Sequence, residues 1–354
     1  MRVALVASLV SPIRPAEANG PHAVIVDLAR GLAARGHEAT IYAAEGSTAD
    51  GCRIVEVPVD AAAAAASVRV GGRPSATALR ALDRGFVRLF EEVRADRPEV
   101  VSQHAFDASP FGLADGLPTV HTLHLPPMED GVLAAARRTE GRLATVSRHA
   151  RRAWQRATGR DVTLLPNGVR DLEPAGGPTL PVALIAGRIA PEKGTDAGIR
   201  AARRAGLAVL VVGDVYDPHY HASAVAPLLR PAELVGALSR EALFQLMARS
   251  AVLLMPIAWD EPFGLVAAEA QMAGCPVVAY RRGALPEVVP HAVGGWLVDP
   301  GEEAGLVDAV RSARTLDRRA IRERARRELG VDRMVDAYER ELLATAARGT
   351  ARAS

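Results

Sequence analysis

Cysteine and long apolar runs are both scarce in this chain of 354 residues. Its two cysteines, Cys52 and Cys275, lie far apart and form no CxxC pair, which argues against a disulfide framework or a structural zinc site and favours a reducing compartment. No apolar run reaches about 18 residues, so the sequence predicts no transmembrane helix. The short apolar start at 2–7 is followed by no signal-peptide cleavage pattern, and we expect a cytoplasmic protein that begins with a β-strand.

An excess of charge of one sign is also missing. The 43 basic and 41 acidic residues leave a net charge of +2, which is too balanced for a dedicated nucleic-acid binder. Lys193 is the only lysine among the 43, and every other basic residue is an arginine. A chain so biased toward arginine that still keeps one lysine indicates a site that needs a compact ammonium group in place of a planar guanidinium.

Short apolar runs alternate with amphipathic ones along the first half, which is typical of a parallel sheet covered by helices. The pattern predicts strands at 2–7, 37–43, 53–57, 99–102, 119–121, 143–146 and 162–164. It predicts helices at 21–35, 77–95 and 148–158. Prolines and glycines then cluster at 171–181, where we expect a linker.

The same alternation restarts after this linker. Strands are predicted at 182–186, 207–212, 233–235, 252–255 and 276–280, and helices at 195–205, 240–249, 263–273, 302–314 and 331–346. We therefore expect an α/β protein with one domain at 1–172, a second at 180–330, and a last helix within 331–354 that packs back on the first domain. Ligands of such sheets bind at the carboxyl ends of the strands, so a cleft between the domains is the expected site.

The densest motif is GRIAPEKGT at 187–195, between a predicted strand and a predicted helix. Glycines let the backbone approach a ligand, and Thr195 is expected to cap the helix, whose free N–H groups favour an anion. Arg188 and Lys193 add two cations, which suits a diphosphate. The residue order matches neither a P-loop nor GxGxxG. The alternative is a plain strand-to-helix turn with solvated charges.

A second motif is WDEPFGLVAAEA at 259–270. Pro262 suits the first helical position, which would leave the N–H groups of 263–265 available to an anion. Glu269 lies among apolar residues, so we expect its carboxylate to be buried and to need a partner such as a ligand hydroxyl. The alternative is that Glu261 belongs to an acidic first turn and that Glu269 bonds to a core arginine.

These two segments together resemble the donor-binding half of the retaining GT-B glycosyltransferases of family 4. GRIAPEKG at 187–194 precedes EPFGLVAAEA at 261–270, in which Glu261 and Glu269 match the family's Glu-x7-Glu pattern. LLPNGV at 164–169, RGALPEVV at 282–289 and LARGLAARGHEATIYAA at 28–44 are similar to further family segments. The resemblance covers nearly the whole chain and implies the GT-B fold, with two Rossmann-like α/β domains and an interdomain cleft.

The resemblance also implies roles for the motif residues toward a nucleotide-diphospho-sugar donor, with UDP favoured over GDP or ADP. Arg188 and Lys193 would hold the diphosphate and neutralise the charge that builds on the leaving group. Glu269 would bind the ribose hydroxyls, and Glu261 would hold a hydroxyl of the donor sugar. The backbone amides expected near the sugar and phosphate are those of Phe263, Gly264 and Leu265.

In the first half, His124 falls where the family often has a histidine beside the reacting sugar, and the alternative is a histidine that caps a strand end. His121 and His124 have a spacing seen in metal ligands, but no carboxylate or cysteine joins them, so no metal site is predicted. The family's glycine-rich loop after the first strand faces the phosphates. Gly20, between Asn19 and Pro21, occupies that place here and departs from the usual glycine pattern.

The resemblance implies transfer with retention and without a metal, in which the leaving phosphate takes the proton of the acceptor. A sugar-nucleotide epimerase or hydrolase on the same fold is the rival, and it would need a carboxylate such as Asp107, Asp115 or Glu129. A catalytically silent nucleotide-sugar-binding subunit is the other alternative. The sequence names neither the acceptor, small or lipid-linked, nor the oligomeric state.

Arginines gather around Trp154 at 148–160 and again at 318–327. A basic amphipathic helix fits peripheral contact with a membrane surface. A solvated arginine face is the favoured interpretation of both clusters, because arginine is abundant throughout the chain.

Overall fold

The computed structural model describes residues 1–14, 20–60 and 76–353. These residues form two compact units, which are described separately below. Among the described residues, unit 1 holds 1–14, 20–166 and 331–353, and unit 2 holds 167–330.

The change of unit at 166 comes before the predicted linker at 171–181. The N–H of Val169 donates to the carbonyl of Leu329 at 2.8 Å, and Val169 forms a parallel bridge with Gly330. These bonds attach the segment just before the predicted linker to the end of unit 2.

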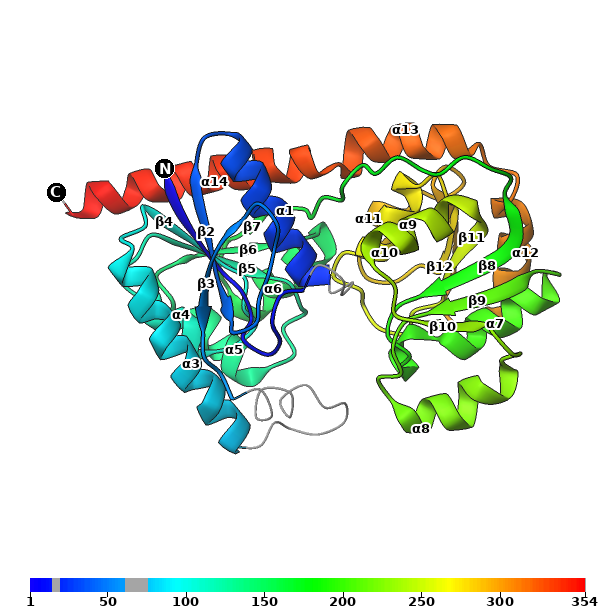
Figure 1. Ribbon diagram of the computed structural model, residues 1–354, viewed down its shortest axis with the longest axis horizontal. Coiled ribbons are helices and arrows are strands. Elements are labelled where there is room, and N and C mark those ends of the chain that lie inside the picture. The colour runs from blue at the N-terminus through cyan, green and yellow to red at the C-terminus, as the bar shows by residue number, and fades with distance from the viewer. Residues whose placement is uncertain (15–19, 61–75, 354) are drawn as a thin grey trace. The chain divides into compact units, whose positions relative to one another are not determined.

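The described part of unit 1 is built on a seven-stranded sheet in the order β3-β2-β1-β4-β5-β6-β7, with parallel pairs throughout (Figure 1). Its strands are β1 (Arg2–Val6), β2 (Glu38–Ala44), β3 (Arg53–Val57), β4 (Val100–Gln103), β5 (Thr119–Leu123), β6 (Arg142–Thr145) and β7 (Val162–Leu164). Val3 of β1 lies opposite Ala39 on one side and Val100 on the other. The central strands are buried along their length, because helices cover both faces of a parallel sheet.

Helices from both ends of the chain cover this sheet. They are α1 (Gly20–Ala34), α3 (Ala76–Ala95), α4 (Ser109–Leu113), α5 (Asp130–Arg138), α6 (Arg148–Thr158) and α14 (Val331–Ala353). The last of these, drawn red in Figure 1, contacts α1, β4 and β5. Glu339 of α14 accepts hydrogen bonds from Arg35 at 2.6 Å and from the ring of His37 at 2.7 Å, which ties the C-terminal helix to unit 1.

The described part of unit 2 repeats this plan with a six-stranded sheet in the order β10-β9-β8-β11-β12-β13, also parallel. Its strands are β8 (Leu180–Ala186), β9 (Ala208–Val212), β10 (Leu234–Gly236), β11 (Ser250–Met255), β12 (Val277–Tyr280) and β13 (Gly295–Val298). Its helices are α7 (Thr195–Arg204), α8 (Pro218–Tyr220), α9 (Arg240–Arg249), α10 (Leu265–Met272), α11 (Leu285–Val288), α12 (Glu303–Ala313) and α13 (Arg318–Leu329).

In each unit the strand order reverses beside the first strand, between β1 and β4 in unit 1 and between β8 and β11 in unit 2. Open α/β sheets bind their ligands beyond the carboxyl ends of the strands at such a reversal. The segments after β8 and β11 carry the two motifs of unit 2, and β5 leads directly to His124. The topology of each unit therefore gathers the predicted site residues at the edge where a ligand is expected.

No element is predicted from the sequence at β13, α4, α5, α8, α11 or α13, and the structure has an element at each of these places. β13 begins with a glycine and has only four residues, so its pattern of apolar residues is too short to be recognised as a strand. In α13 the buried apolar stripe consists of Ile321, Ala325 and Leu329, and arginines fill most other positions.

Only some of the arginines of α13 form the solvated face that the sequence favoured, since Arg319, Arg326 and Arg327 are exposed and others point inward. Arg318 donates to the carbonyls of Ala248 and Ser250, both at 2.8 Å, where α9 ends and leaves carbonyls without helical partners. Arg324 is 9% exposed and donates to Oε1 of Gln271 at 2.9 Å. That interpretation is therefore wrong for these inward-pointing side chains.

The cluster around α6 departs from the same interpretation at one position. Arg160 donates to the carbonyls of Ala136 at 2.7 Å, Thr139 at 2.8 Å and Gly141 at 2.9 Å, so it holds the end of α5 and the following turn. Arg148, Arg152 and Arg156 are exposed, as a solvated face requires.

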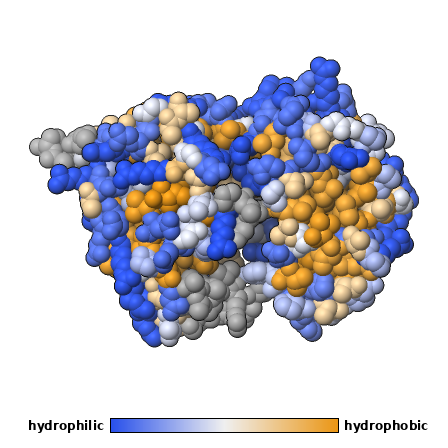
Figure 2. Space-filling view, viewed as in Figure 1, coloured by the Kyte–Doolittle hydropathy of each residue, from blue (hydrophilic) through white to orange (hydrophobic). Residues whose placement is uncertain are grey.

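Apolar side chains also reach the surface. Figure 2 shows them among charged residues on the visible face of each unit. Large exposed ones include Leu79 and Val87 on α3, and Val215 and Val235 in unit 2, a scatter that is ordinary for a folded chain. None of the helices among the described residues combines the length and the apolar character that crossing a membrane requires.

Candidate functional site

The segment after β8 forms the first part of the site in unit 2. Pro191–Lys193 make one 3₁₀ turn, and Gly194 follows in the left-handed conformation with φ of 64°. A Cβ on Gly194 would lie 2.1 Å from the carbonyl oxygen of Pro256, so this turn presses against the segment after β11. Gly194 is also the N-cap of α7, and the prediction that Thr195 caps this helix is wrong because Thr195 is already helical.

Lys193 meets Glu261 at the centre of this site. Its Nζ lies 2.9 Å from Oε2 of Glu261, although the two residues are 68 positions apart in the chain. The indole N–H of Trp259 donates to the same oxygen at 2.8 Å, and the ammonium group lies 5.3 Å from the centre of the indole ring. The side chains of Lys193 and Glu261 are 22% and 15% exposed, so their attraction is less screened than that of a surface pair.

The structure thus joins two residues that the sequence singled out separately. Trp259 belongs to the second motif, but the sequence predicts no site role for it. Its position two residues before Glu261 was the available signal.

Arg188 is held at the same edge in a more exposed position. Its Nε and Nη2 lie 3.1 and 2.9 Å from Oε1 of Glu192, and its guanidinium lies 4.8 Å from the centre of the Tyr216 ring. The side chain is 44% exposed. The backbone carbonyl of Glu192 accepts the N–H of Ala258 at 2.8 Å, which links the segments after β8 and β11 a second time.

The start of α10 differs from the prediction. The helix begins at Leu265, because Gly264 has φ of 94° and a positive φ is incompatible with a right-handed helix. The helical bonds start with the N–H of Ala268, which donates to the carbonyl of Gly264 at 3.1 Å. Pro262 is therefore not the first helical residue. Phe263 and Gly264 lie in the preceding turn, and the free amides of the first helical turn are those of 265–267.

The segment after β12 supports the backbone of Glu261. A Cβ on Gly283 would lie 2.4 Å from both the backbone nitrogen and the carbonyl oxygen of Glu261. The N–H of Ala284 donates to the Glu261 carbonyl at 2.8 Å, and Arg282 donates to the carbonyl of Ala258. The segment 282–289 resembles a family segment, but no site residue is predicted within it, since backbone contacts leave no trace in a sequence.

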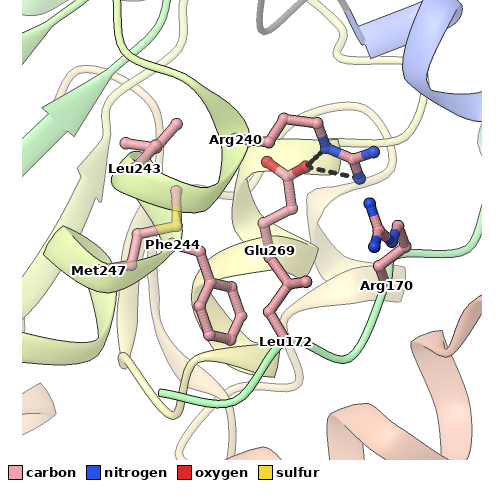
Figure 3. A pocket seen from close by; sticks show the side chains of 7 residues that line it. All are labelled: Arg170, Leu172, Arg240, Leu243, Phe244, Met247 and Glu269. Atoms are coloured by element: carbon pink, nitrogen blue, oxygen red, sulfur yellow. Dashed lines mark hydrogen bonds and ion pairs between the residues drawn. The ribbon is translucent and has the colours of Figure 1, made fainter. Parts of the chain in front are cut away.

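Glu269 lies on α10 at a small pocket that Figure 3 shows from close by. Its Oε1 is 3.3 Å from both Nε and Nη2 of Arg240 on α9, and the Arg170 side chain lies beside this pair. The apolar lining comes from Leu172, Leu243, Phe244 and Met247. The Glu269 side chain is 19% exposed, so it is half-buried and not fully buried as predicted. Pairing with an arginine was the alternative reading of this residue, and Arg240 itself was missed among so many arginines.

In unit 1, His124 follows β5 and is 8% exposed. Its Nε2 lies 2.9 Å from Nδ1 of His104, which follows β4, and Nε2 of His104 lies 2.9 Å from Oγ of Ser102. Tyr338 of α14 stacks on the His104 ring at 5.7 Å between ring centres. Desolvation lowers the pKa of His124 to about 4 and holds the pKa of His104 well below its usual value, so both rings are neutral. No motif or spacing in the sequence singles out His104, Ser102 or Tyr338.

His121 lies in a separate buried network, and the structure does not bring it to His124 as a second ligand. Its ring nitrogens contact Oε1 of Gln103 at 3.2 Å and Oγ1 of Thr139 at 3.1 Å. Across the described residues, no group of three His, Cys, Asp or Glu side chains is arranged to hold a metal ion.

Gly20 is the first residue of α1, and Asn19 lies outside the described residues. Two positions along the helix, His22 is 5% exposed, and burial lowers its pKa to about 4.

Of the carboxylates considered for the rival activities, Asp115 and Glu129 are exposed. Asp107 is half-buried after β4, where desolvation and then the charge of Asp83 raise its pKa to about 6.

Two family models match successive parts of the chain. "Glycosyltransferase Family 4" matches residues 18–171, and "Glycosyl transferases group 1" matches residues 175–328, so together they span most of it. The chain belongs to the group 1 glycosyltransferases. The resemblance noted from the motifs is confirmed at the level of the family.

Curated members of the glycosyltransferase family are related over part of their length. A D-inositol 3-phosphate glycosyltransferase from Nocardioides sp. is 34% identical over 165 residues, which is 40% of this chain and 35% of that protein. The chain thus spans about a third of the length of this relative.

Solved structures match nearly end to end. Sucrose-phosphate synthase from Thermosynechococcus elongatus is 19% identical, with a TM-score of 0.76 and all of both chains covered. Anabaena HepE in complex with UDP-glucose is also 19% identical, with a TM-score of 0.73, 97% of this chain and all of that chain covered. At this level of identity the likeness establishes the fold, and the predicted GT-B class with two Rossmann-like units is confirmed.

Proposed function

We propose that the chain transfers a sugar from a nucleotide-diphospho-sugar to an acceptor, with unit 2 binding the donor and unit 1 the acceptor. The observation that carries this function is the cluster of Lys193, Glu261 and Trp259 beyond the carboxyl ends of β8 and β11, where the sheet order reverses. An ion pair between a lone lysine and a half-buried carboxylate contributes little to stability, but its two charged groups are well suited to bind a charged, hydroxyl-rich ligand.

The charges of the cluster suit the two ends of such a donor. A diphosphate that approaches Lys193 and Arg188 competes with Glu261 and Glu192 for these cations, because phosphate oxygens carry more charge than a carboxylate. The Glu261 carboxylate is then available to accept a hydrogen bond from a hydroxyl of the donor sugar, while the indole N–H of Trp259 still donates to the carboxylate. The free amides at the start of α10, with that of Leu265 among them, add partial positive charge in the segment that follows Glu261.

Glu269 is proposed to bind the ribose hydroxyls of the nucleotide. Its half-buried carboxylate is held by Arg240 and retains exposed surface. UDP is the favoured nucleotide, and the UDP-glucose complex of the structurally similar HepE supports this choice.

His124 is proposed to lie beside the reacting sugar, and Gly20 to lie near the donor phosphates. Transfer would proceed with retention. It would need no metal, because cationic side chains and helix amides take over charge neutralisation on the leaving group. The leaving phosphate would accept the acceptor's proton as the new glycosidic bond forms and the bond to the phosphate breaks.

A nucleotide-sugar epimerase or hydrolase is the second candidate, and Asp107 is the observation that favours it. A carboxyl group whose pKa is raised to about 6 is suited to proton transfer near neutral pH. Such an enzyme would convert the donor without any acceptor.

Donor binding is tested by calorimetric and thermal-shift titration with UDP, GDP, ADP, dTDP and their common sugars. A ligand at about 100 times its dissociation constant adds about 2.7 kcal/mol of stability. Lys193→Met should weaken binding of the selected nucleotide by tenfold or more, on the order of 1.4 kcal/mol. Arg204→Met, which removes one exposed positive charge from the far end of α7, is the matched control. Equal losses in both variants would contradict a specific phosphate site at Lys193.

Turnover separates the candidate activities. Release of UDP from UDP-glucose is measured alone and with a panel of monosaccharides, sugar phosphates, D-inositol 3-phosphate and lipid-linked sugars. Release that depends on one acceptor supports the transferase, and equal release without acceptor supports the hydrolase. Conversion of the sugar without release of UDP supports the epimerase, and binding without turnover indicates a silent subunit.

A further inference from the structure

A hydrogen-bonded chain in unit 1 runs from Ser102 through His104 to His124. Oγ of Ser102 lies 2.9 Å from Nε2 of His104, and Nδ1 of His104 lies 2.9 Å from Nε2 of His124. Ser102 and His104 are 0% and 3% exposed, and His124 is 8% exposed, so water does not compete strongly for these bonds. Neutral imidazole carries one proton, which means that each ring donates through one nitrogen and accepts through the other.

The Ser102 hydroxyl decides the direction of this chain. Within the described residues, the ring of His104 is the one hydrogen-bond partner of its Oγ. A buried hydroxyl proton needs an acceptor, whereas an unused oxygen lone pair is tolerated more readily. Ser102 therefore donates to Nε2 of His104, which leaves the His104 proton on Nδ1.

The position of the His104 proton also determines the direction of the hydrogen bond between His104 and His124. Because Nδ1 of His104 donates, Nε2 of His124 must accept, and the single proton of the His124 ring lies on Nδ1. In the reverse direction His124 would donate to Nδ1 of His104 and His104 would donate to Oγ of Ser102, which would leave the hydroxyl proton buried without a partner.

Tyr338 holds the middle ring of the chain in place without entering it. Its ring stacks on His104 with an angle of 23° between the planes, and its hydroxyl lies 3.3 Å from Oγ1 of Thr122. The C-terminal helix α14 thus fixes the orientation of His104, and with it the direction in which Nδ1 donates.

We propose that Ser102 and His104 are positioning residues that set His124 as a neutral hydrogen-bond donor through Nδ1. Its place in catalysis rests on the proposed function. A neutral N–H suits an oxygen of an uncharged sugar, such as a hydroxyl. Since Nε2 already accepts from His104, His124 has no vacant basic nitrogen and cannot abstract a sugar proton.

The tautomer is read directly by long-range ¹H–¹⁵N correlation spectra of the full chain labelled with ¹⁵N-histidine, near pH 7.5. His124→Gln and His104→Gln assign the two rings among the 9 histidines. The expected spectrum has the proton of both rings on Nδ1. A proton on Nε2 of His124 overturns the proposal, whatever the variants do. The spectrum needs neither donor nor turnover, so this failure is distinct from a failure of the proposed transferase.

Ser102→Ala tests the relay itself. Loss of the hydroxyl should let a second His124 tautomer appear, and in the transfer assay it should lower kcat by about tenfold with the KM for UDP-glucose unchanged. Thr139→Val is the matched control, because it removes the Thr139 hydroxyl that contacts the ring of His121, another buried histidine of the same sheet. This variant should leave the His124 signals and kcat unchanged. Equal effects of the two variants would reduce Ser102 to a packing role and overturn the relay.

Discussion

Acidification should unfold unit 1 at a mildly acidic pH, because four of its histidines are buried in the neutral form. Desolvation lowers the pKa of His22 and His124 to about 4 and that of His121 to about 3, and it holds the pKa of His104 well below the usual value. In the unfolded chain each of these rings regains a pKa of about 6.5.

The sign follows from which state binds more protons. Between about pH 6.5 and pH 4 the unfolded chain binds a proton on each of these histidines and the folded chain does not. Their contribution to stability is therefore fully present above the unfolded pKa and is lost as the pH falls toward the folded values. Asp107 acts in the opposite direction, because its raised pKa of about 6 lets the folded state take up a proton first.

The magnitude follows from the number of protons. Near about pH 5 the four histidines and Asp107 leave a net difference of about three protons, which corresponds to ~4 kcal/mol of lost stability per pH unit. A domain of this size has roughly 5–15 kcal/mol of stability in total. Unit 1 should therefore approach its unfolding transition near pH 5 without denaturant.

Urea unfolding at several pH values measures this loss, and the tryptophans allow each unit to be followed. Trp154 is buried in unit 1, while Trp259 and Trp296 belong to unit 2, and the chain has 3 tryptophans in all. Trp259→Phe combined with Trp296→Phe leaves Trp154 as the reporter of unit 1.

His121→Gln is the control, since glutamine keeps a polar side chain between Gln103 and Thr139 but does not titrate. It should reduce the pH slope by ~1.4 kcal/mol per pH unit. A change of less than about 1 kcal/mol in the unfolding free energy of wild-type unit 1 between pH 7 and pH 5 would refute the reasoning.

Gly283→Ala should destabilise unit 2 by about 2 kcal/mol or more, because the new Cβ would lie 2.4 Å from the backbone nitrogen and carbonyl oxygen of Glu261. Gly206→Ala shares the positive φ but meets nothing within 4 Å and should cost only about 1 kcal/mol, so equal losses in urea unfolding would contradict the contact. Arg322→Met should destabilise unit 2 by about 2 kcal/mol, since its 13% exposed side chain bonds to the carbonyl of Leu172. Arg319→Met removes an 87% exposed arginine and should change stability by less than about 0.5 kcal/mol, and a larger loss there would contradict this ranking.

Local pattern was enough to predict the class of fold. The alternation of apolar and amphipathic runs is a property of single elements, and most predicted elements lie within a few residues of the observed ones. The elements that were not predicted, β13, α4, α5, α8, α11 and α13, are short or carry too thin an apolar stripe to stand out. The start of α10 was misplaced because a proline and a glycine compete as helix starts, and only the backbone angle of Gly264 decides between them.

The chemistry of the motifs was also readable in the chain, because a lone lysine and a Glu-x7-Glu spacing need no partner to be noticed. The contact between Lys193 and Glu261 was not readable in the chain. Lys193 reaches Glu261 because β8 pairs with β11, although the strands β9 and β10 and the helices α7, α8 and α9 lie between them along the chain. Strand order is a long-range property that no local pattern encodes.

The sequence alone determined the α/β class, the family and the charged residues of the donor motifs, since each of these lies in consecutive or regularly spaced side chains. The tertiary structure decided which groups those side chains face. It turned Arg318 and Arg324 inward to carbonyl and amide oxygens, joined Ser102, His104 and His124 into one chain, and placed Tyr338 of the last helix over it. Such contacts involve backbone groups and distant elements, whose positions only the folded chain specifies.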